Sequence, residues 1–462
     1  MDTQQQARNA THSSGHTAMD VDETAAAASV TAAVASSAGL PDPANSSSST
    51  EQQPPARQIQ LQSDTEVSLT DFLSSLGRYD SKLCGDSSKK YERIMKIGQG
   101  TFGEVFKARS RLEKNLIAMK KIKMEHELEG FPITAIREIR ILLAANHKNL
   151  VKLLEICKTE PTKANRYKSE FHLIFEMLDH DLAGLLANPK VTFTLAEKKD
   201  MLHQLLEGVW YLHRVNILHR DMKAANILIS KKGVLKLADF GLARNITTSD
   251  KTRQYTGRVV TLWYRPPELL LGDRQYGPPL DMWGVGCIVA EMWTRSPIMQ
   301  GGAEQKQLEL IVNLCGSITK EVWPNCEKLE LYQEMCAGLP SNQKRKVKER
   351  LRRYINDTEE GLDLIDKLLQ LNPATRLTAE HALDHNFFFV EPERTSIEPK
   401  LQTIDVSCFE LLVSSRQAKP PMGVLGGGAG GGGVGRGGPG GSRMQVPPTR
   451  NFPDNPNYDR IF

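Results

Sequence analysis

The stretch His219-Arg220-Asp221-Met222-Lys223-Ala224-Ala225-Asn226, followed thirteen residues after Asn226 by Asp239-Phe240-Gly241, decides how this sequence is interpreted. A strand-like run at residues 234–237 separates the two motifs. Phosphoryl transfer needs a carboxylate that orients the attacking hydroxyl group, oxygen ligands for magnesium, and cations that neutralise charge on the γ-phosphate. The two motifs supply all three kinds of group, and their order and spacing are specific. The sequence therefore predicts two loops that together carry phosphoryl-transfer chemistry.

A glycine-rich segment precedes these loops in the chain. At the boundary of two predicted strands it reads Ile97, Gly98, Gln99, Gly100, Thr101, Phe102, Gly103, Glu104 and Val105. Because glycine has no Cβ, such a segment can bring its backbone close to phosphate groups. It is not a Walker loop, since no Gly-Lys-Ser or Gly-Lys-Thr follows. Taken alone, the segment is equally consistent with an ordinary tight hairpin.

Two further positions are candidates for charge pairing. Lys120 follows Ala118 and Met119 in an apolar, strand-like run, where an inward-facing lysine needs an anionic partner such as a phosphate or a carboxylate. Alternatively, Lys120 is an edge lysine whose ammonium group reaches solvent. Residues 132–140 read as the start of a helix, on which Arg137 and Glu138 point about 100° apart. A solvated charge pair is the alternative interpretation there.

The composition changes twice along the chain of 462 residues. Residues 1–89 are rich in Ser, Thr, Ala and Gln and contain few aromatic residues, which predicts disorder. Residues 90–389 combine a strand-rich start with long stretches of helical periodicity, which predicts one folded unit. Residues 390–462 form an extension that contains a glycine-rich tether.

Charge and cysteine content exclude several classes of protein. The chain carries 59 basic and 55 acidic residues, so no overall attraction to nucleic acid or to a membrane is expected. The seven scattered cysteines include no Cys-x-x-Cys pair, which predicts neither a zinc site nor a disulfide framework. No apolar stretch is long enough to cross a membrane, and no signal pattern is recognisable. We therefore expect a soluble intracellular protein without a direct nucleic-acid or membrane partner.

Together the motifs resemble those of the eukaryotic protein kinases, over residues 91–389. The resemblance implies an α+β, bilobal kinase fold, with a β-rich small lobe at residues 90–177 and a helical large lobe at residues 178–389. It also implies ATP and Mg²⁺ as cofactors. The catalytic residues that it implies are Lys120, Glu138, Asp221 and Lys223, and the implied magnesium ligands are Asn226 and Asp239.

The resemblance also assigns a role to each of these groups. Lys120 should contact the α- and β-phosphates and pair with Glu138, while Asp221 should act as the catalytic base. Lys223 should neutralise the γ-phosphate, as in kinases that phosphorylate serine and threonine. Besides the glycine-rich segment, the implied nucleotide-binding residues are Ala118, Lys120, the gatekeeper Phe175, Glu176 and Leu178 of the hinge, and Asp181 near the ribose.

Within this family the sequence resembles the cyclin-dependent kinases. Residues 132–138 are similar to their cyclin-contacting helix, and residues 263–268 are similar to the end of their activation segment. The sequence is most similar to the transcriptional members. This resemblance implies a T-type cyclin as partner and nuclear localisation. It also implies Ser/Thr-Pro sites in the RNA polymerase II C-terminal domain and in elongation factors as substrates. The isoleucine at position 136, however, is similar to the residue that the cyclin-dependent kinases numbered 12 and 13 have at this point of the helix. A cell-cycle kinase and a non-catalytic pseudokinase scaffold are further interpretations, with less support from the motifs.

The resemblance also identifies Thr256 as an activating phosphorylation site. Arg137, Arg220 and Arg244 are the candidate anchors for its phosphate, because guanidinium groups bind phosphate through paired, charge-assisted hydrogen bonds. An unmodified loop threonine is the alternative. A buried ion pair between Glu268 and Arg376 is expected to stabilise the large lobe. The dense basic run at residues 344–353 is either a solvated helix face or a nuclear-import signal.

Overall fold

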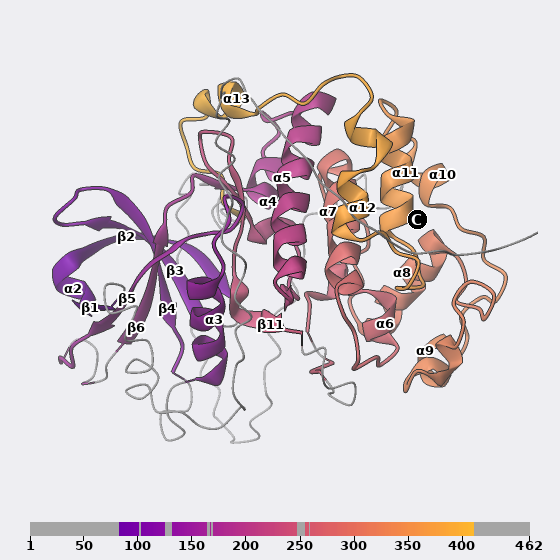
Figure 1. Cartoon of the computed structure of the whole chain (residues 1–462), viewed down its shortest axis with the longest axis horizontal. Helices are drawn as coiled ribbons and strands as arrows, with labels where there is room; N and C mark the ends of the chain where they lie inside the picture. Colours follow the sequence, from indigo (N-terminus) through magenta and orange to yellow (C-terminus); the bar gives the residue numbers. More distant parts are fainter. Residues whose placement is uncertain are drawn as a thin grey trace, which may run out of the picture. The chain divides into compact units, whose positions relative to one another are not determined.

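A six-stranded sheet forms the first part of the described chain (Figure 1). The computed structural model describes residues 83–100, 103–124, 132–163, 167, 170–246, 255–257 and 259–410. The strands are β1 (Leu83–Asp86), β2 (Tyr91–Gly100), β3 (Gly103–Ser110), β4 (Leu116–Ile122), β5 (Leu153–Thr159) and β6 (Glu170–Glu176). Their order is β1-β5-β6-β4-β3-β2, and every neighbouring pair is antiparallel except the parallel pair β1 and β5.

One long helix, α3 (Ile133–Ala144), accompanies this sheet. Its buried residues recur at helical spacing and include Ile136, Ile139 and the charged Glu138. The register of β4 places Lys120 between Val105 of β3 and Leu173 of β6. The helix and the central strand thus each contribute one charged side chain to an otherwise apolar interior, and such charges require a partner there.

Helices build the second lobe. They are α4 (Leu182–Ala187), α5 (Leu195–Arg214), α6 (Pro267–Leu270), α7 (Pro279–Thr294), α8 (Glu304–Cys315), α9 (Tyr332–Cys336), α10 (Val347–Leu351), α11 (Glu359–Leu368), α12 (Ala379–Leu383) and α13 (Glu398–Gln402). A capping box between Thr194 and Glu197 starts α5. Helix α7 is buried on almost every side, and Trp283 within it is fully buried. The α+β fold with a sheet lobe and a helical lobe is therefore confirmed.

Short strands and single helical turns carry the loops between the lobes. Three strands pair in the order β10 (Leu235–Leu237), β9 (Ile227–Ile229) and β7 (His180–Asp181), and β11 (Arg244–Asn245) pairs with β8 (Ile217–Leu218). The 3₁₀ turns are η3 (Ala224–Asn226), η4 (Phe240–Leu242), η5 (Leu262–Tyr264), η6 (Cys326–Lys328) and η7 (Asn386–Phe388). The first predicted catalytic motif ends in η3, which packs against α4, and the second includes the start of η4, which packs against α3.

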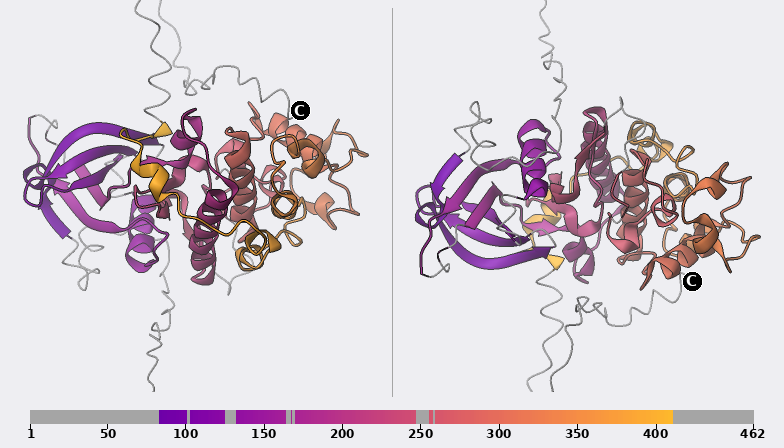
Figure 2. Two further views of the ribbon diagram at one scale, coloured as in Figure 1. Left: turned by 90° about the horizontal axis from the view of Figure 1, so that it is seen from above. Right: turned by 90° about the horizontal axis from the view of Figure 1, so that it is seen from below.

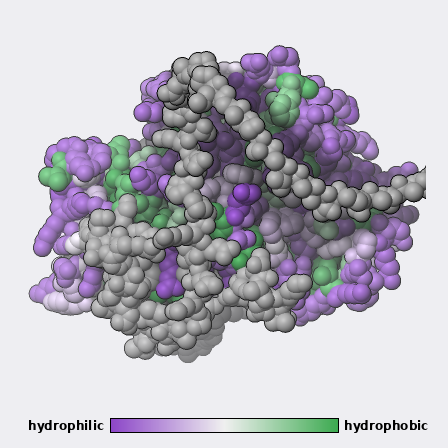
Figure 3. All heavy atoms as spheres, viewed as in Figure 1, coloured by the Kyte–Doolittle hydropathy of each residue, from purple (hydrophilic) through white to green (hydrophobic). Residues whose placement is uncertain are grey.

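A buried apolar cluster runs through both lobes, and a smaller one lies within the sheet lobe. On the face drawn in Figure 3, the described residues are mainly hydrophilic and the hydrophobic ones form separate small groups. Among the described residues, no helix is long and apolar enough to span a membrane.

The described helices and strands extend past both boundaries that composition predicted for the folded unit. The sheet starts with β1 at Leu83 rather than at residue 90, because β1 pairs with β5. The following turn, α2 (Ser87–Lys90), is held by hydrogen bonds that join Ser87 Oγ with Thr159 Oγ1 at 2.7 Å and with His172 Nδ1 at 3.2 Å. At the other end, residues 390–410 continue along the helical lobe and include α13. Such side-chain pairings across the sheet leave no signal in local composition.

Two other expectations concern single residues. The predicted ion pair forms: Arg376 Nη1 and Nη2 donate to the two carboxylate oxygens of Glu268 at 2.7 and 2.9 Å, and both side chains are buried. The cysteine pattern, in contrast, did not predict that Cys157 in β5 is disulfide-bonded.

Three of the seven cations in the basic run at residues 344–353 form ion pairs. Lys348 Nζ lies 2.5 Å from Asp363, Arg345 Nε lies 2.8 Å from Asp366, and Arg352 pairs with Glu359. These ion pairs are compatible with a solvated helix face, and the import signal stays an alternative prediction.

Candidate active site

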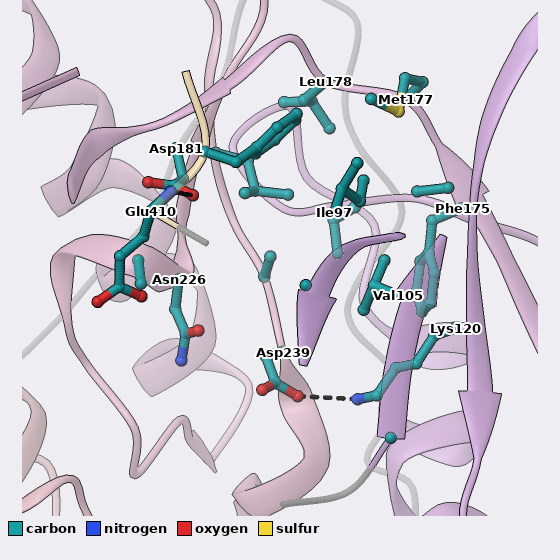
Figure 4. Close-up of a pocket in the computed structure, with 18 of the residues that line it drawn as sticks. Ile97, Val105, Lys120, Phe175, Met177, Leu178, Asp181, Asn226, Asp239 and Glu410 are labelled. Atoms are coloured by element: carbon teal, nitrogen blue, oxygen red, sulfur yellow. Dashed lines mark hydrogen bonds and ion pairs between the residues drawn. The ribbon is translucent and has the colours of Figure 1, made fainter. Parts of the chain in front are cut away.

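A pocket lies between the sheet lobe and the helical lobe (Figure 4). Strands β2, β3 and β4 form one wall, the chain after β6 forms the back, and the loops around η3 and η4 form the floor. Of the predicted site residues, those lining the pocket are Ile97, Gly98, Gln99, Gly103, Val105, Ala118, Lys120, Glu138, Phe175, Glu176, Leu178, Asp181, Lys223, Asn226 and Asp239. The fold thus brings together residues that are far apart in the sequence.

Lys120 is the central cation of the pocket. Its Nζ donates to Glu138 Oε1 at 2.7 Å and to Asp239 Oδ1 at 2.8 Å, and the second contact is drawn in Figure 4. Burial alone would lower the pKa of Lys120, but the charges of Asp239 and Glu138 outweigh it and raise the pKa. Lys120 therefore stays protonated at neutral pH, which rules out the alternative of a solvent-exposed edge lysine.

Asp239 is held in an uncommon conformation. Its backbone is left-handed, with φ 63° and ψ 75°, which costs energy for a residue other than glycine and is typical of functional sites. Burial favours the neutral acid, yet the Lys120 ammonium group lowers the pKa of Asp239 to about 2. Asp239 is thus an anion at neutral pH, and its second carboxylate oxygen remains available for a cation.

Packing between the two catalytic loops fixes their relative position. The Ala238 N–H donates to the Asn226 carbonyl oxygen at 2.9 Å, and the His219 ring nitrogen Nε2 lies 3.0 Å from the Ala238 carbonyl oxygen. The rings of His219 and Phe240 meet edge to face at 5.1 Å. The first motif and the second motif are therefore linked by both backbone and side-chain contacts.

Three neighbours surround the Asp221 carboxylate. Lys223 Nζ donates to Oδ2 at 2.6 Å, Thr261 Oγ1 donates to Oδ1 at 2.8 Å, and Asn226 Nδ2 donates to Oδ2 at 3.0 Å. Asn226 Nδ2 also reaches the Asp221 carbonyl oxygen at 2.8 Å. Because the amide nitrogen of Asn226 is engaged there, its oxygen faces the Asp239 side of the pocket in Figure 4. A carboxylate and an amide oxygen on one side are hard ligands that suit Mg²⁺.

Asp281 supports the backbone of the first catalytic motif, although no sequence motif indicated this residue. Asp281, at the start of α7, accepts the backbone N–H groups of His219 at 3.0 Å and Arg220 at 2.9 Å. His213 Nε2 lies 3.0 Å from the same carboxylate. Although burial raises the pKa of Asp281, the hydrogen bonds from His213 and the backbone produce a net lowering. The only local signal was an acidic residue in the first turn of an apolar helix.

The glycine-rich segment is described in part. Thr101 and Phe102 lie outside the described residues, as does the side-chain environment of Gly100. Position 103 has no room for a side chain, because a Cβ on Gly103 would lie 2.2 Å from the Lys121 carbonyl oxygen. Glu104 pairs with Lys96 at 2.5 Å and does not line the pocket, although it was predicted to bind the cofactor.

The hinge residues have distinct roles. The Glu176 carboxylate accepts hydrogen bonds from Lys236 Nζ at 2.7 Å and from the Lys152 N–H at 2.8 Å, so its side chain fixes the hinge. Asp181 caps α4 by accepting the Gly184 N–H at 2.6 Å, and burial raises the pKa of Asp181 to about 7. The pocket also contains Phe409 and Glu410 from the C-terminal extension, which the sequence did not indicate.

Two of the predicted phosphate-anchoring arginines lie next to residues 255–257. Arg220 Nη1 donates to the Tyr276 hydroxyl at 2.8 Å, and that hydroxyl donates to the Thr256 carbonyl oxygen at 2.8 Å. The Arg244 guanidinium lies 5.2 Å from the centre of the Tyr255 ring. The third arginine, Arg137, is half-buried on α3. The side chain of Thr256 is exposed, so it is accessible to modification.

Comparisons with known proteins agree with this geometry. The family model described as protein kinase domain matches residues 91–388. Cyclin-dependent kinase 9 of Danio rerio is 58% identical over 337 residues, covering 72% of this chain and 89% of that protein. The human protein of the same name is 56% identical over 344 residues, covering 74% of this chain and 92% of that protein. The chain belongs to the cyclin-dependent protein kinases.

A solved structure is also similar to this kinase. It is described as the crystal structure of the yeast RNA Pol II CTD kinase CTDK-1 complex, and one of its chains matches with a TM-score of 0.60 and 37% identity. The match covers 66% of the kinase and 95% of that chain. The kinase is therefore a cyclin-dependent serine/threonine protein kinase, which sets aside the pseudokinase interpretation.

Proposed function

We propose that this kinase, bound to a T-type cyclin in the nucleus, transfers the γ-phosphoryl group of ATP to serine or threonine followed by proline. The proposed substrates are the C-terminal domain of RNA polymerase II and elongation factors, so that the kinase promotes transcription elongation. The relatives named cyclin-dependent kinase 9 and the yeast RNA polymerase II kinase support this choice of substrate. The observation that carries the catalytic part is the double contact of Lys120 with Glu138 and Asp239.

The positions of the site residues support the roles that we propose for them. Lys120, held protonated by two carboxylates, is placed to bind the α- and β-phosphates. Asp221 is placed to orient the substrate hydroxyl, and Lys223 beside it is placed to neutralise the transferred phosphoryl group. Asp239 and Asn226 would hold Mg²⁺, which neutralises charge on the phosphates when bound.

The preference for proline rests on Val260. Its φ is 66°, a left-handed conformation that is unusual for a β-branched residue. The Val260 carbonyl oxygen accepts a hydrogen bond from Arg265 Nη2 at 3.0 Å, and Arg265 Nη1 lies 2.6 Å from Glu304. A substrate residue bound here would lose the hydrogen bond between its backbone N–H and water. The Val260 carbonyl oxygen would not replace that bond, because it already accepts from Arg265, and an unsatisfied N–H is unfavourable. Proline has no N–H and avoids that penalty.

Dependence on a cyclin is consistent with α3. This helix carries Glu138 on its buried face, and Ile133 at its start is 40% exposed. A partner that covers Ile133 would also fix the position of Glu138 against Lys120. The T-type assignment rests on the likeness to cyclin-dependent kinase 9, whereas Ile136 favours a kinase similar to those numbered 12 and 13. Mass spectrometry of the cyclin that co-purifies with the tagged kinase separates these two proposals.

The proposed function is tested with the purified cyclin complex and peptides of the polymerase repeat. We expect phosphate transfer from ATP to a Ser-Pro peptide, and a loss of about 5- to 150-fold in kcat/KM when the proline is replaced by alanine, since one unsatisfied N–H costs about 1–3 kcal/mol. Equal kcat/KM for the two peptides would contradict proline selection at Val260. The absence of transfer to either peptide would contradict the proposed substrate.

A further inference from the structure

The pocket is built from two segments that are far apart in the chain, the hinge after β6 and the loop that carries Asp239. Figure 4 shows Met177 and Leu178 of the hinge at one end of the pocket and Asp239 toward the other. From above and from below, Figure 2 shows the sheet and the helices at opposite ends of the described part of the molecule. A ligand long enough to contact both segments therefore depends on the separation between them.

A side chain that does not line the pocket joins these two segments. Lys236 lies in β10, three residues before Asp239, and its Nζ donates to Glu176 Oε1 at 2.7 Å. The side chains of Lys236 and Glu176 are 16% and 30% exposed. Because this ion pair is partly shielded from water, it holds its two ends together more firmly than a pair on the open surface does.

The hinge end of this contact is held at a second point. The same oxygen, Glu176 Oε1, accepts the Lys152 N–H at 2.8 Å. The ammonium group of Lys236 also lies 3.5 Å from the Leu150 carbonyl oxygen. One cation thus connects the hinge and the segment that leads into β5, so the hinge cannot shift against β10 without breaking several polar contacts.

Backbone hydrogen bonds hold the two residues between this lysine and Asp239. The Leu237 N–H donates to the Asn149 carbonyl oxygen at 2.8 Å. The Ala238 N–H donates to the Asn226 carbonyl oxygen at 2.9 Å. The short stretch from the lysine to Asp239 is therefore stiff, and a displacement of the lysine is passed on to the Asp239 carboxylate.

We propose that Lys236 is a positioning residue for the nucleotide, because its bond to Glu176 sets the separation between the hinge and Asp239. The inference rests on the proposed nucleotide site. There, Mg²⁺-ADP or Mg²⁺-ATP would contact both ends of this separation, the base at the hinge and the metal at Asp239, and its affinity depends on how well both contacts are aligned. Adenosine, which has no phosphates and carries no metal, would depend on the hinge alone.

The chain offers variants that separate this role from other effects. Lys236→Met removes the ammonium group and keeps a long side chain, whereas Lys236→Arg keeps a cation that can reach a carboxylate. Glu176→Gln alters the other end of the bond and leaves the backbone groups of the hinge in place. Lys148→Met is the matched control: Lys148 Nζ lies 3.1 Å from Glu207 Oε2 of α5, and neither residue lines the pocket.

The first measurement is a titration of Mg²⁺-ADP and of adenosine against the purified cyclin complex of each form. Lys236→Met should raise the Kd of Mg²⁺-ADP about three- to tenfold, as expected for the loss of one charge-assisted hydrogen bond. The Kd of adenosine should stay within about twofold. Lys236→Arg should restore most of the affinity for Mg²⁺-ADP, and Lys148→Met should leave both ligands unaffected.

The outcomes of this titration are distinct. Unchanged binding of Mg²⁺-ADP by Lys236→Met would overturn the positioning role alone. An equal loss for both ligands would also overturn it, because the damage would then be local to the hinge. No binding of Mg²⁺-ADP by the wild type would overturn the proposed nucleotide site itself.

The second measurement separates positioning from simple attraction between the lysine and the phosphates. If charge alone mattered, Glu176→Gln would strengthen the binding of Mg²⁺-ADP, because it removes an anion. Positioning predicts weaker binding instead. The double variant Lys236→Met with Glu176→Gln should lose no more affinity than Lys236→Met, since both changes remove the same contact. Stronger binding by Glu176→Gln, or additive losses in the double variant, would contradict the inference.

Discussion

Arg220 and Tyr276 form a buried hydrogen bond in which the guanidinium Nη1 donates to the phenol oxygen at 2.8 Å. The same phenol group donates to the Thr256 carbonyl oxygen at 2.8 Å, so Tyr276 connects the catalytic loop to the proposed phosphorylation site. Arg220 is held from its other side by the Leu242 carbonyl oxygen at 2.6 Å from Nε. This chain of contacts couples the state of Thr256 to the loop that holds Asp221.

Tyr276→Phe should loosen this connection. The change removes both hydrogen bonds of the hydroxyl group and leaves Arg220 with one buried donor unpaired, which should lower the free energy of unfolding by about 1–3 kcal/mol. Hydrogen exchange at residues 255–257 should become faster. Tyr332→Phe is the control, because that hydroxyl bonds to the Ile318 carbonyl oxygen at 3.2 Å and not to Arg220 or Thr256. Unchanged exchange in Tyr276→Phe would show that the connection has no role.

Thr256→Ala should leave the kinase nearly inactive when it is bound to cyclin. A phosphate on Thr256 would give Arg220 and Arg244 a shared anion, which the alanine variant cannot supply. The measurement is kcat/KM of the cyclin complex after treatment with an activating kinase, for the alanine variant and the wild type. Full activity of the variant would show that phosphorylation at Thr256 is not required.

Glu268→Gln should destabilise the helical lobe without changing the chemistry. Arg376 would keep its place but lose a buried, two-point ionic partner, and breaking such a pair costs about 3–5 kcal/mol of unfolding free energy. Glu309→Gln is the matched control, because its partner Lys306 is exposed and such pairs contribute about 0–1 kcal/mol. Urea denaturation of both variants gives the comparison. Equal midpoints would contradict a structural role for the Glu268 pair.

Glu291 makes stability depend on pH. Burial raises the pKa of Glu291 to about 8, and its carboxyl group lies 2.7 Å from the Tyr264 hydroxyl. In the unfolded chain its pKa is about 4.3, so the unfolded state binds fewer protons between these values. The contribution of Glu291 to the free energy of unfolding is therefore fully present below about pH 4.3. It is lost as the pH rises to about 8, by up to about 1.4 kcal/mol per pH unit. Glu291→Gln should flatten the stability profile over this range, and an unchanged slope in urea titrations would refute the assignment.

The motifs with fixed spacing are the part of the site that could be predicted from the sequence. Asp221, Asn226 and Asp239 each belong to such a motif, and the pocket contains or adjoins all of them. Asp281 and Tyr276 could not be predicted, because their roles arise from packing between segments about 60 residues apart in the chain. Nor does local sequence show that the strand at Leu83–Asp86 joins the sheet or that Glu410 reaches Asp181.

Asp239→Asn should abolish phosphoryl transfer but preserve the fold. Asparagine keeps the size of the side chain, yet it removes the negative charge that faces Lys120 at 2.8 Å and that is proposed to hold Mg²⁺. Isothermal titration of Mg²⁺ in the presence of ADP should show at least about tenfold weaker binding. Mg²⁺ binding equal to that of the wild type would exclude Asp239 as a ligand.

The most direct test of the catalytic account is the rate of phosphate transfer from radiolabelled ATP to a Ser-Pro peptide by the Asp221→Asn kinase. The protein is measured as the Thr256-phosphorylated cyclin complex, with wild type alongside and ADP binding as a check on folding. Because Asp221 is placed to orient the attacking hydroxyl, we expect a fall in kcat of at least about 10²-fold with nearly unchanged ADP affinity. Transfer at a rate close to that of the wild type would contradict the account.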